Sequence, residues 1–174
     1  SGEEGKLDMY TGSDIAPGFF AWAIPSGDTT RIGAWSKAEL LDGRSPEQLL
    51  SALMSKPQWM HRFSNCREVG RFCGPVPSGI VRHPLKDRVM LFGDAAGLCK
   101  PTTGGGIGPG FMHVEKMVTP LIKKLSGEIS DARFESIVNE YLKTKRKEQM
   151  RARALRDAFL TQMSDQELDE VFSV

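Results

Sequence analysis

Residues 88–107 constrain the fold of this chain more than any other stretch. Residues 89–93 are an apolar run typical of a buried strand, and Asp94 follows them with a carboxylate. Pro101 then stiffens the chain, and the glycines at positions 104–106 leave the backbone bare. We therefore predict a strand that ends in an acidic, glycine-rich loop.

An amphipathic helix is predicted directly after the glycines, with Thr102 or Thr103 as a candidate cap. The first N–H groups of a helix have no intrahelical partner, so Pro109 is tolerated there. A carboxylate, bare glycines and a helix N-terminus favour a binding loop, whereas the alternative is a loop that only turns the chain. The apolar residues with helical spacing are Ile107, Phe111, Val114, Met117, Val118, Leu121, Ile122 and Leu125.

A β-hairpin with one strongly aromatic face is predicted for residues 19–35. Strand alternation places Phe20, Trp22 and Ile24 on one face, while Pro25 begins the turn at residues 25–28. The residues alone leave two interpretations open, an ordinary sheet core or the wall of an apolar pocket.

Residues 88–107 resemble the second flavin-contacting motif of FAD-dependent oxidoreductases with the para-hydroxybenzoate hydroxylase type of fold. The resemblance implies an α/β fold, of the FAD/NAD(P)-binding kind, in which Asp94 holds the ribityl chain of FAD. It also implies that backbone amides of the glycine run face the pyrimidine edge of the flavin. The residues that it assigns to FAD are Asp94, Ala95, Pro101, Gly104, Gly105, Gly106 and Ile107.

Residues 16–28 resemble the Pro-x-x-(Tyr/Phe)-x-Trp-x-Phe-Pro-x-Gly segment of geranylgeranyl reductases, flavoenzymes that saturate polyprenyl double bonds. The resemblance implies a polyprenyl lipid substrate, with Phe20, Trp22, Ile24 and Pro25 as its contacts. Phe20 stands where the family often has Tyr, so position 20 supplies no phenol hydroxyl. Ile24 stands where Phe is frequent.

Three functional regions follow from these resemblances. Residues 1–80 are expected to belong to the substrate-binding antiparallel sheet, residues 81–126 to contact the flavin, and residues 127–174 to form a helical region. Catalytic residues stay unknown: His61 is isolated, and His113 and Glu115 do not share a helix face. The electron donor is open between NAD(P)H and ferredoxin. A hydroxylase, halogenase, dehydrogenase or non-catalytic interaction module remain the alternatives.

The dinucleotide fingerprint Gly-x-Gly-x-x-Gly is missing from a binding context, because Phe111 and Met112 follow where it needs a third small residue. The family keeps this fingerprint near its N-terminus. We therefore expect the chain to be the C-terminal part of a longer flavoprotein. By itself it should bind FAD weakly or not at all, and it should be inactive.

Four further elements are predicted. Ser45 caps a helix that ends near residue 55, and residues 67–76 form a strand confined to an edge by its prolines. A second helix covers residues 131–147, and Ser164 starts a last short helix with a capping box. Seven basic residues against one acid at 143–156 leave two interpretations, a surface that rests on anionic lipid or a solvated helix face.

Composition narrows the function classes. The formal net charge of +1 gives no argument for a nucleic-acid partner. Cys66, Cys73 and Cys99 have neither an even number nor metal-ligand spacing, so we expect no disulfide framework and no metal site. No apolar run is long enough to span a bilayer. These features predict a cytoplasmic protein that lies, at most, against the inner face of the membrane.

Overall fold

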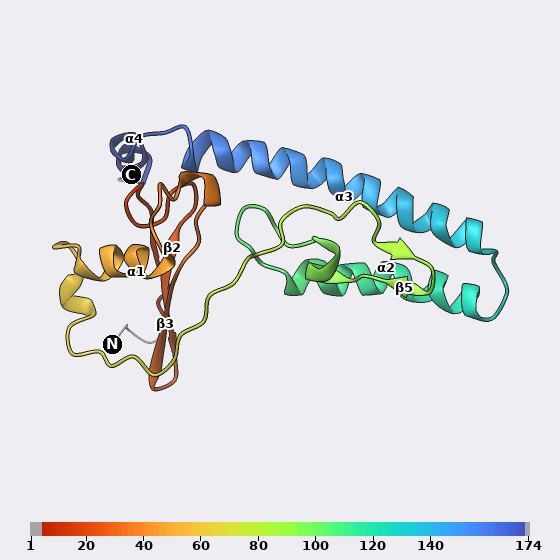
Figure 1. The fold of residues 1–174 in the computed structure, drawn as a ribbon, viewed down its shortest axis with the longest axis horizontal. Helices are drawn as coiled ribbons and strands as arrows, with labels where there is room; N and C mark the ends of the chain where they lie inside the picture. Colours follow the sequence, from red (N-terminus) through yellow and green to blue (C-terminus); the bar gives the residue numbers. More distant parts are fainter. Residues whose placement is uncertain (1–4, 173–174) are drawn as a thin grey trace. The chain divides into compact units, whose positions relative to one another are not determined.

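The computed structural model describes residues 5–172, which divide into two compact units (Figure 1). Unit 1 contains the described residues up to Cys73 and from Arg156 onward, and unit 2 is Gly74–Leu155. Each unit combines short antiparallel strands with helices, which confirms the predicted mixed α/β class. Within residues 5–172, every helix is too short or too polar to cross a membrane.

Unit 1 is built on a three-stranded antiparallel sheet in the order β1-β2-β3. The strands are β1 (Asp8–Tyr10), β2 (Ala21–Ser26) and β3 (Thr29–Ala34). The predicted hairpin is confirmed, although β2 extends to Ser26 because only Gly27 and Asp28 turn the chain. Gly27 has a φ of 59°, a left-handed conformation that glycine adopts without strain.

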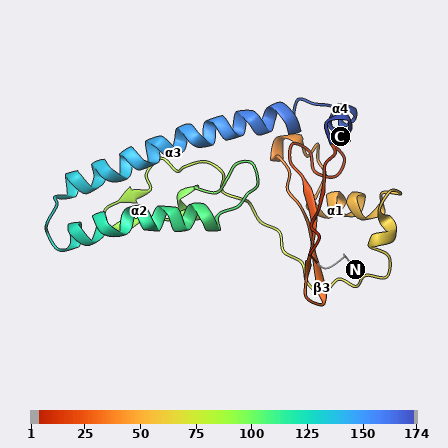
Figure 2. The same ribbon diagram turned by 180° about the vertical axis from the view of Figure 1, so that it is seen from behind.

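Helix α1 (Pro46–Ser55) covers one face of this sheet (Figure 2). The predicted capping box is present, since Ser45 Oγ accepts from the Gln48 N–H and Gln48 Oε1 accepts from the Ser45 N–H. Two short 3-10 helices, η1 (Ala38–Leu40) and η2 (Met60–Arg62), flank α1. The core beneath them consists of Tyr10, Ile15, Ala16, Ala21, Ala23, Leu53 and Phe63.

The C-terminal part of unit 1 is held by charged groups. The Arg156 guanidinium lies 4.3 Å from the centre of the Phe19 ring, and Asp157 accepts from Lys37 Nζ at 3.0 Å. Helix α4 (Asp165–Phe172) starts at the predicted capping box of Ser164 with Glu167. Polar contacts therefore fix residues 156–172 on the same unit as the hairpin.

Unit 2 contains a two-residue hairpin, a 3-10 turn and two long helices. The hairpin pairs β4 (Leu85–Lys86) with β5 (Val89–Met90), and η3 (Gly93–Ala96) follows. Helix α2 (Ile107–Leu125) matches the predicted start and end, but its N-cap is Gly106 and neither threonine caps it. The buried core residues of unit 2 are Ala96, Leu98, Met117, Phe134, Val138 and Leu142.

Two strand predictions were wrong. Only Val89 and Met90 of residues 89–93 are in a strand, and Val89 is exposed, since β4 is its only pairing partner among the described residues. Residues 67–76 form no strand, and the side chain of Phe72 is 94% exposed. An apolar run becomes a buried strand only when neighbouring strands satisfy its backbone, and the described residues supply none here.

The last helical region is a single helix, α3 (Asp131–Leu160), where the sequence predicted a helix followed by a partial amphipathic segment. Its buried residues Phe134, Val138 and Leu142 are spaced by four, as predicted. Beyond residue 147 this face of the helix is polar, and Gln149 and Arg153 donate from it to backbone carbonyls of unit 2.

The apolar residues predicted for one face of α2 divide between the core of unit 2 and solvent: Met117 is buried, and Leu121 packs against the same core. The six other predicted members are 44–78% exposed, while His113, like Met117, is buried. Helical spacing predicts that such residues share a face, but it does not say what covers that face. The exposed members are Ile107, Phe111, Val114, Val118, Ile122 and Leu125.

Candidate functional site

The loop η3 and the first turn of α2 lie against each other, backbone to backbone. A Cβ built on Gly106 would be 2.0 Å from Asp94 Oδ1, and one built on Gly93 would be 3.5 Å from the Cα of Gly110. A side chain at position 106 would therefore displace the Asp94 carboxylate, whereas a Cβ at position 93 would make an ordinary van der Waals contact. The sequence predicted that the carboxylate and the glycine run meet, and in the structure they do.

Unpaired polar groups gather at this meeting point. Asp94 is exposed, and its carboxylate accepts no hydrogen bond from residues 5–172. The N–H groups of Gly106, Ile107 and Gly108 have no acceptor in that range either. An anion-accepting helix N-terminus beside a free carboxylate can bind both oxygen acceptors and hydroxyl donors of one ligand.

The glycine loop closes on itself before the helix begins. Lys100 N–H donates to the Gly105 carbonyl at 3.0 Å, and Gly104 N–H donates to the Lys100 carbonyl at 2.9 Å. Gly104 has a φ of 69°, and Gly105 N–H contacts Thr103 Oγ1 at 3.4 Å. Of the amides predicted to face a flavin, those of Gly104 and Gly105 are therefore already used within the loop.

The other predicted FAD contacts differ in exposure. Ala95 and Ile107 are exposed, and Pro101 is buried. Lys100 carries an exposed side chain next to the loop, while the neighbouring Cys99 is buried and donates to the Pro77 carbonyl at 2.8 Å. Burial, followed by the negative charge of Asp94, raises the pKa of the Cys99 thiol, so it stays protonated at neutral pH.

A second backbone segment supports the loop from behind. Ser78 pairs with Leu98 in an antiparallel bridge, and Val81 N–H donates to the Ala96 carbonyl at 3.2 Å. A Cβ on Gly97 would be 1.9 Å from the Gly79 carbonyl oxygen. Gly97 has a φ of 73°, so both its conformation and its neighbour require glycine here.

Three side chains of α3 fix these two segments. Gln149 Nε2 donates to the carbonyls of Gly97 and Cys99, at 2.8 and 3.1 Å. Arg146 and Arg153 donate to carbonyls of the supporting segment, at Val81 and Ser78. The sequence analysis missed this role, because the contacts join residues at least 50 positions apart. The only sequence feature that pointed to this role was the uncharged Gln149 within the basic segment of the helix.

His113 of α2 is buried behind the loop with both ring nitrogens unpaired. It stacks on Tyr141, with ring centres 5.2 Å apart, and contacts the ring of Phe92, which precedes Gly93. Burial lowers the pKa of His113. The His113 side chain is therefore uncharged at neutral pH and serves as a packing residue. Its buried environment gives it no role as an acid.

The predicted substrate residues lie on unit 1. Phe20 and Trp22 have ring centres 6.0 Å apart on the sheet face opposite the core, where Ile24 is also half-buried. The Trp22 ring covers Gly33 of β3, since a Cβ there would be 2.3 Å from the ring. Met9 pairs with Trp22 from β1 and is exposed on the same face. Sequence analysis missed Gly33 and Met9.

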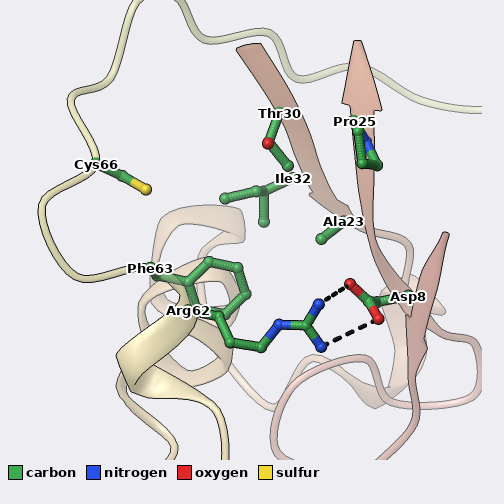
Figure 3. Close-up of a pocket in the computed structure, with 8 residues that line it drawn as sticks. All are labelled: Asp8, Ala23, Pro25, Thr30, Ile32, Arg62, Phe63 and Cys66. Atoms are coloured by element: carbon green, nitrogen blue, oxygen red, sulfur yellow. Dashed lines mark hydrogen bonds and ion pairs between the residues drawn. The ribbon is translucent and has the colours of Figure 1, made fainter. Parts of the chain in front are cut away.

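Pro25 lies apart from the other three, because strand alternation turns it to the opposite face. There it lines a small pocket with Asp8, Ile32, Phe63 and the exposed Cys66 (Figure 3). Arg62 closes one side of this pocket through two hydrogen bonds to the Asp8 carboxylate. The predicted substrate set is thus divided between the two faces of the sheet.

No cluster of three or more histidine, cysteine or acidic side chains with metal-ligand geometry exists within residues 5–172. The charged residues near the candidate site are isolated side chains. The chemistry that these residues offer is therefore hydrogen bonding, charge and apolar area.

Comparison with known proteins bears on both regions. Residues 75–152 match the family model described as FAD binding domain. Over its whole length the chain superposes on a geranylgeranyl bacteriochlorophyll reductase-like protein from Thermoplasma acidophilum, with a TM-score of 0.81 and 21% identity, covering 44% of that chain.

Curated relatives share low identity with part of the chain. It is 34% identical over 112 residues to digeranylgeranylglycerophospholipid reductase of Methanoculleus marisnigri, which is 61% of this chain and 26% of that protein. It is 29% identical over 104 residues to the chloroplastic geranylgeranyl diphosphate reductase of Nicotiana tabacum, 60% of this chain and 21% of that protein. The chain thus spans about a quarter of the length of the curated relatives that it matches.

Proposed function

Because the chain belongs to the FAD-dependent geranylgeranyl reductase family, we propose that the protein carrying it reduces double bonds of polyprenyl groups in lipids. In this proposal, unit 2 supplies one side of an FAD site and unit 1 supplies apolar contacts for the substrate. The electron donor, NAD(P)H or ferredoxin, is left open.

One observation carries the flavin part of the proposal: the unpaired carboxylate of Asp94 lies next to the unpaired N–H groups at the N-terminus of α2. Asp94 would accept hydrogen bonds from ribityl hydroxyls, which are donors without charge. The N–H groups of Gly106 and Ile107 would donate to carbonyl oxygens at the pyrimidine edge. The close approach of Asp94 to Gly106 brings the carboxylate next to the helix N-terminus, so both could contact one ligand.

FAD in its reduced form would supply hydride for the double bond. The residues of this chain would position and insulate the reaction rather than exchange protons. The helix N-terminus favours negative charge at the pyrimidine edge, and Lys100 adds an exposed cation beside it. Cys99 is unsuitable as a proton donor to the site, because its thiol is buried and bonded to Pro77. We propose that the catalytic acid lies outside this chain or is water.

The open face of the unit 1 sheet supports the polyprenyl part. An isoprenoid chain has few polar atoms, so its binding site must consist of apolar area. Phe20, Trp22 and Ile24 provide such area, together with Met9 and the bare backbone at Gly33. We retain Phe20, Trp22 and Ile24 as proposed contacts and Pro25 as a proposed neighbour from the opposite face.

The deciding experiment uses the whole protein that carries this chain. We would purify it, record its visible spectrum, release any bound chromophore and identify it by mass. Asp94→Asn keeps the size of the side chain and removes its charge, and Asp87→Asn, an exposed acid in the β4–β5 turn, is the matched control. We expect bound FAD, weakened about tenfold by Asp94→Asn and unchanged by Asp87→Asn.

Reduction of a geranylgeranyl lipid by the FAD-loaded protein, followed by product mass, tests the substrate. Consumption of NAD(P)H with addition of oxygen to an aromatic substrate would instead support a hydroxylase of the same fold. A folded whole protein that cannot be loaded with FAD would overturn the proposal and leave the glycine loop as structure. For the chain alone we propose weak or absent FAD binding and no activity.

A further inference from the structure

We infer that the outward face of α3 between residues 143 and 155 docks on an anionic lipid surface. The inference concerns unit 2 alone and rests on which of its cations are used internally. Its choice of a lipid partner rests also on the proposed function, since a reductase of lipid-borne polyprenyl groups meets its substrate in a membrane.

The basic residues of this part of α3 fall into two sets. Lys145 pairs with Glu148 at 2.7 Å, and Arg146 and Arg153 bond to backbone carbonyls. Arg156, at the start of the unit 1 part of the helix, pairs with Asp157. Three cations remain without any partner among residues 5–172, and they are Lys143, Lys147 and Arg151.

These three cations form one stripe. They are spaced by four residues, which places them on the same side of a helix, and all three are exposed. The partnered residues and the core residue Leu142 occupy the opposite side.

Apolar side chains accompany the stripe. Met150 is 68% exposed and Leu155 is 60% exposed, and both flank Arg151. The acid nearest to them, Glu148, is neutralised by Lys145. Cations that attract phosphate head groups, next to apolar groups that enter the head-group region, are the features of a helix that lies on a membrane.

A nucleic-acid surface is the less favoured partner. Such surfaces interleave their cations with aromatic or hydrogen-bonding side chains that contact bases. Between residues 143 and 155 the exposed side contains neither aromatic residues nor asparagine. Methionine and leucine gain free energy from leaving water at a lipid surface, and they gain little from a sugar-phosphate backbone.

The test is co-sedimentation of the protein with vesicles of phosphatidylcholine, with and without phosphatidylglycerol, at low and high salt. Each lysine or arginine near an anionic surface contributes about fivefold to binding, so replacing three should weaken it about a hundredfold. We expect Lys143→Glu/Lys147→Glu/Arg151→Glu to lose binding to phosphatidylglycerol vesicles. Exchanging lysine and arginine at the same positions should keep it.

The matched control changes net charge equally elsewhere on unit 2. Arg88, Lys116 and Lys123 are exposed and lie off this stripe, so Arg88→Glu/Lys116→Glu/Lys123→Glu should keep most of the binding. Thermal unfolding of each variant checks that it folds. Equal loss in both triple variants would mean that binding follows net charge alone, and it would overturn the inference.

Two further outcomes would also overturn it: unchanged vesicle binding by the stripe variant, or binding to a single-stranded RNA oligonucleotide in place of vesicles. The result is separable from the proposed function. A protein without FAD that still binds vesicles through the stripe would refute the function only. A stripe variant that keeps reductase activity on detergent-solubilised substrate, yet still binds vesicles normally, would refute the docking surface only.

Discussion

A methyl group at Gly106 would lie 2.0 Å from Oδ1 of Asp94, a distance at which no real Cβ contact is found. Residue 106 is therefore restricted to glycine by the side chain proposed to hold FAD. The two residues are 12 positions apart, and the turn of α2 brings them into contact.

Gly106→Ala should displace the Asp94 carboxylate and weaken FAD binding by the whole protein about tenfold, measured by titration of the apoprotein. Gly108→Ala is the matched control, because nothing lies within 4 Å of a Cβ there. Alanine at position 108 should also stabilise α2 by about 0.5–1 kcal/mol. Equal FAD affinity in both variants would refute the proposed role of this contact.

Gln149→Leu should lower the free energy of unfolding by about 1–3 kcal/mol, because the Gly97 and Cys99 carbonyls lose their donor. Denaturant unfolding measures the change. Gln162→Leu, at an exposed position, should alter stability by no more than about 0.5 kcal/mol. If the two variants were equally stable, Gln149 would not be holding the loop.

Because of His113, the free energy of unfolding should decrease at acidic pH. Its pKa is lowered in the folded state, so the unfolded chain binds the proton first. Above the ordinary histidine pKa of about 6.5, protonation of His113 should not reduce the free energy of unfolding. As the pH drops from there toward the pKa of His113 in the folded state, the free energy of unfolding should fall. Urea unfolding at a series of pH values measures this fall.

His113→Leu should remove this acid-side fall, and it should also relieve two buried ring nitrogens that have no partner. The control is His61→Gln, because His61 is exposed and should leave the pH dependence unchanged. A His113→Leu variant with the same pH profile as the unmodified chain would assign the effect to other groups.

The exposed apolar stripe of α2 should make the isolated chain self-associate, because a contiguous apolar patch of this length is rarely left in water. Val118→Lys/Ile122→Lys should shift the chain toward monomer in analytical ultracentrifugation. Thr119→Lys/Glu115→Lys adds charge at exposed positions off the stripe and should not have this effect. A monomeric unmodified chain would contradict the prediction.

Local features of the sequence predicted most elements correctly. The capping boxes at Ser45 and Ser164, the hairpin around Gly27 and the start of α2 depend on residues within a few positions of one another. Signals of this range are encoded in spacing and side-chain type. The same holds for the loop itself, where Asp94 and the glycines were predicted to meet.

The sequence could not predict which segments lack a neighbouring strand or a covering element. Residues 67–76 and 89–93 have strand-like composition, but a strand requires a neighbour, and composition does not specify one. Likewise, the period of α2 predicted one apolar face without saying whether that face is covered. Of the residues predicted for that face, Met117 is buried together with the unpredicted His113, while six others are exposed.

The sequence by itself thus determined the helices, the hairpin and the acidic glycine loop, because periodicity, caps and turn residues act over short distances. Only the tertiary structure decided which groups of that loop stay free. Of the four amides predicted to face a flavin, that of Gly104 donates to Lys100 and that of Gly105 contacts Thr103. Gln149 of α3 holds the loop in place. Outside the loop, the tertiary structure likewise decided that the Trp22 ring covers Gly33. These choices depend on which distant side chain reaches which backbone atom, and close packing in three dimensions sets that.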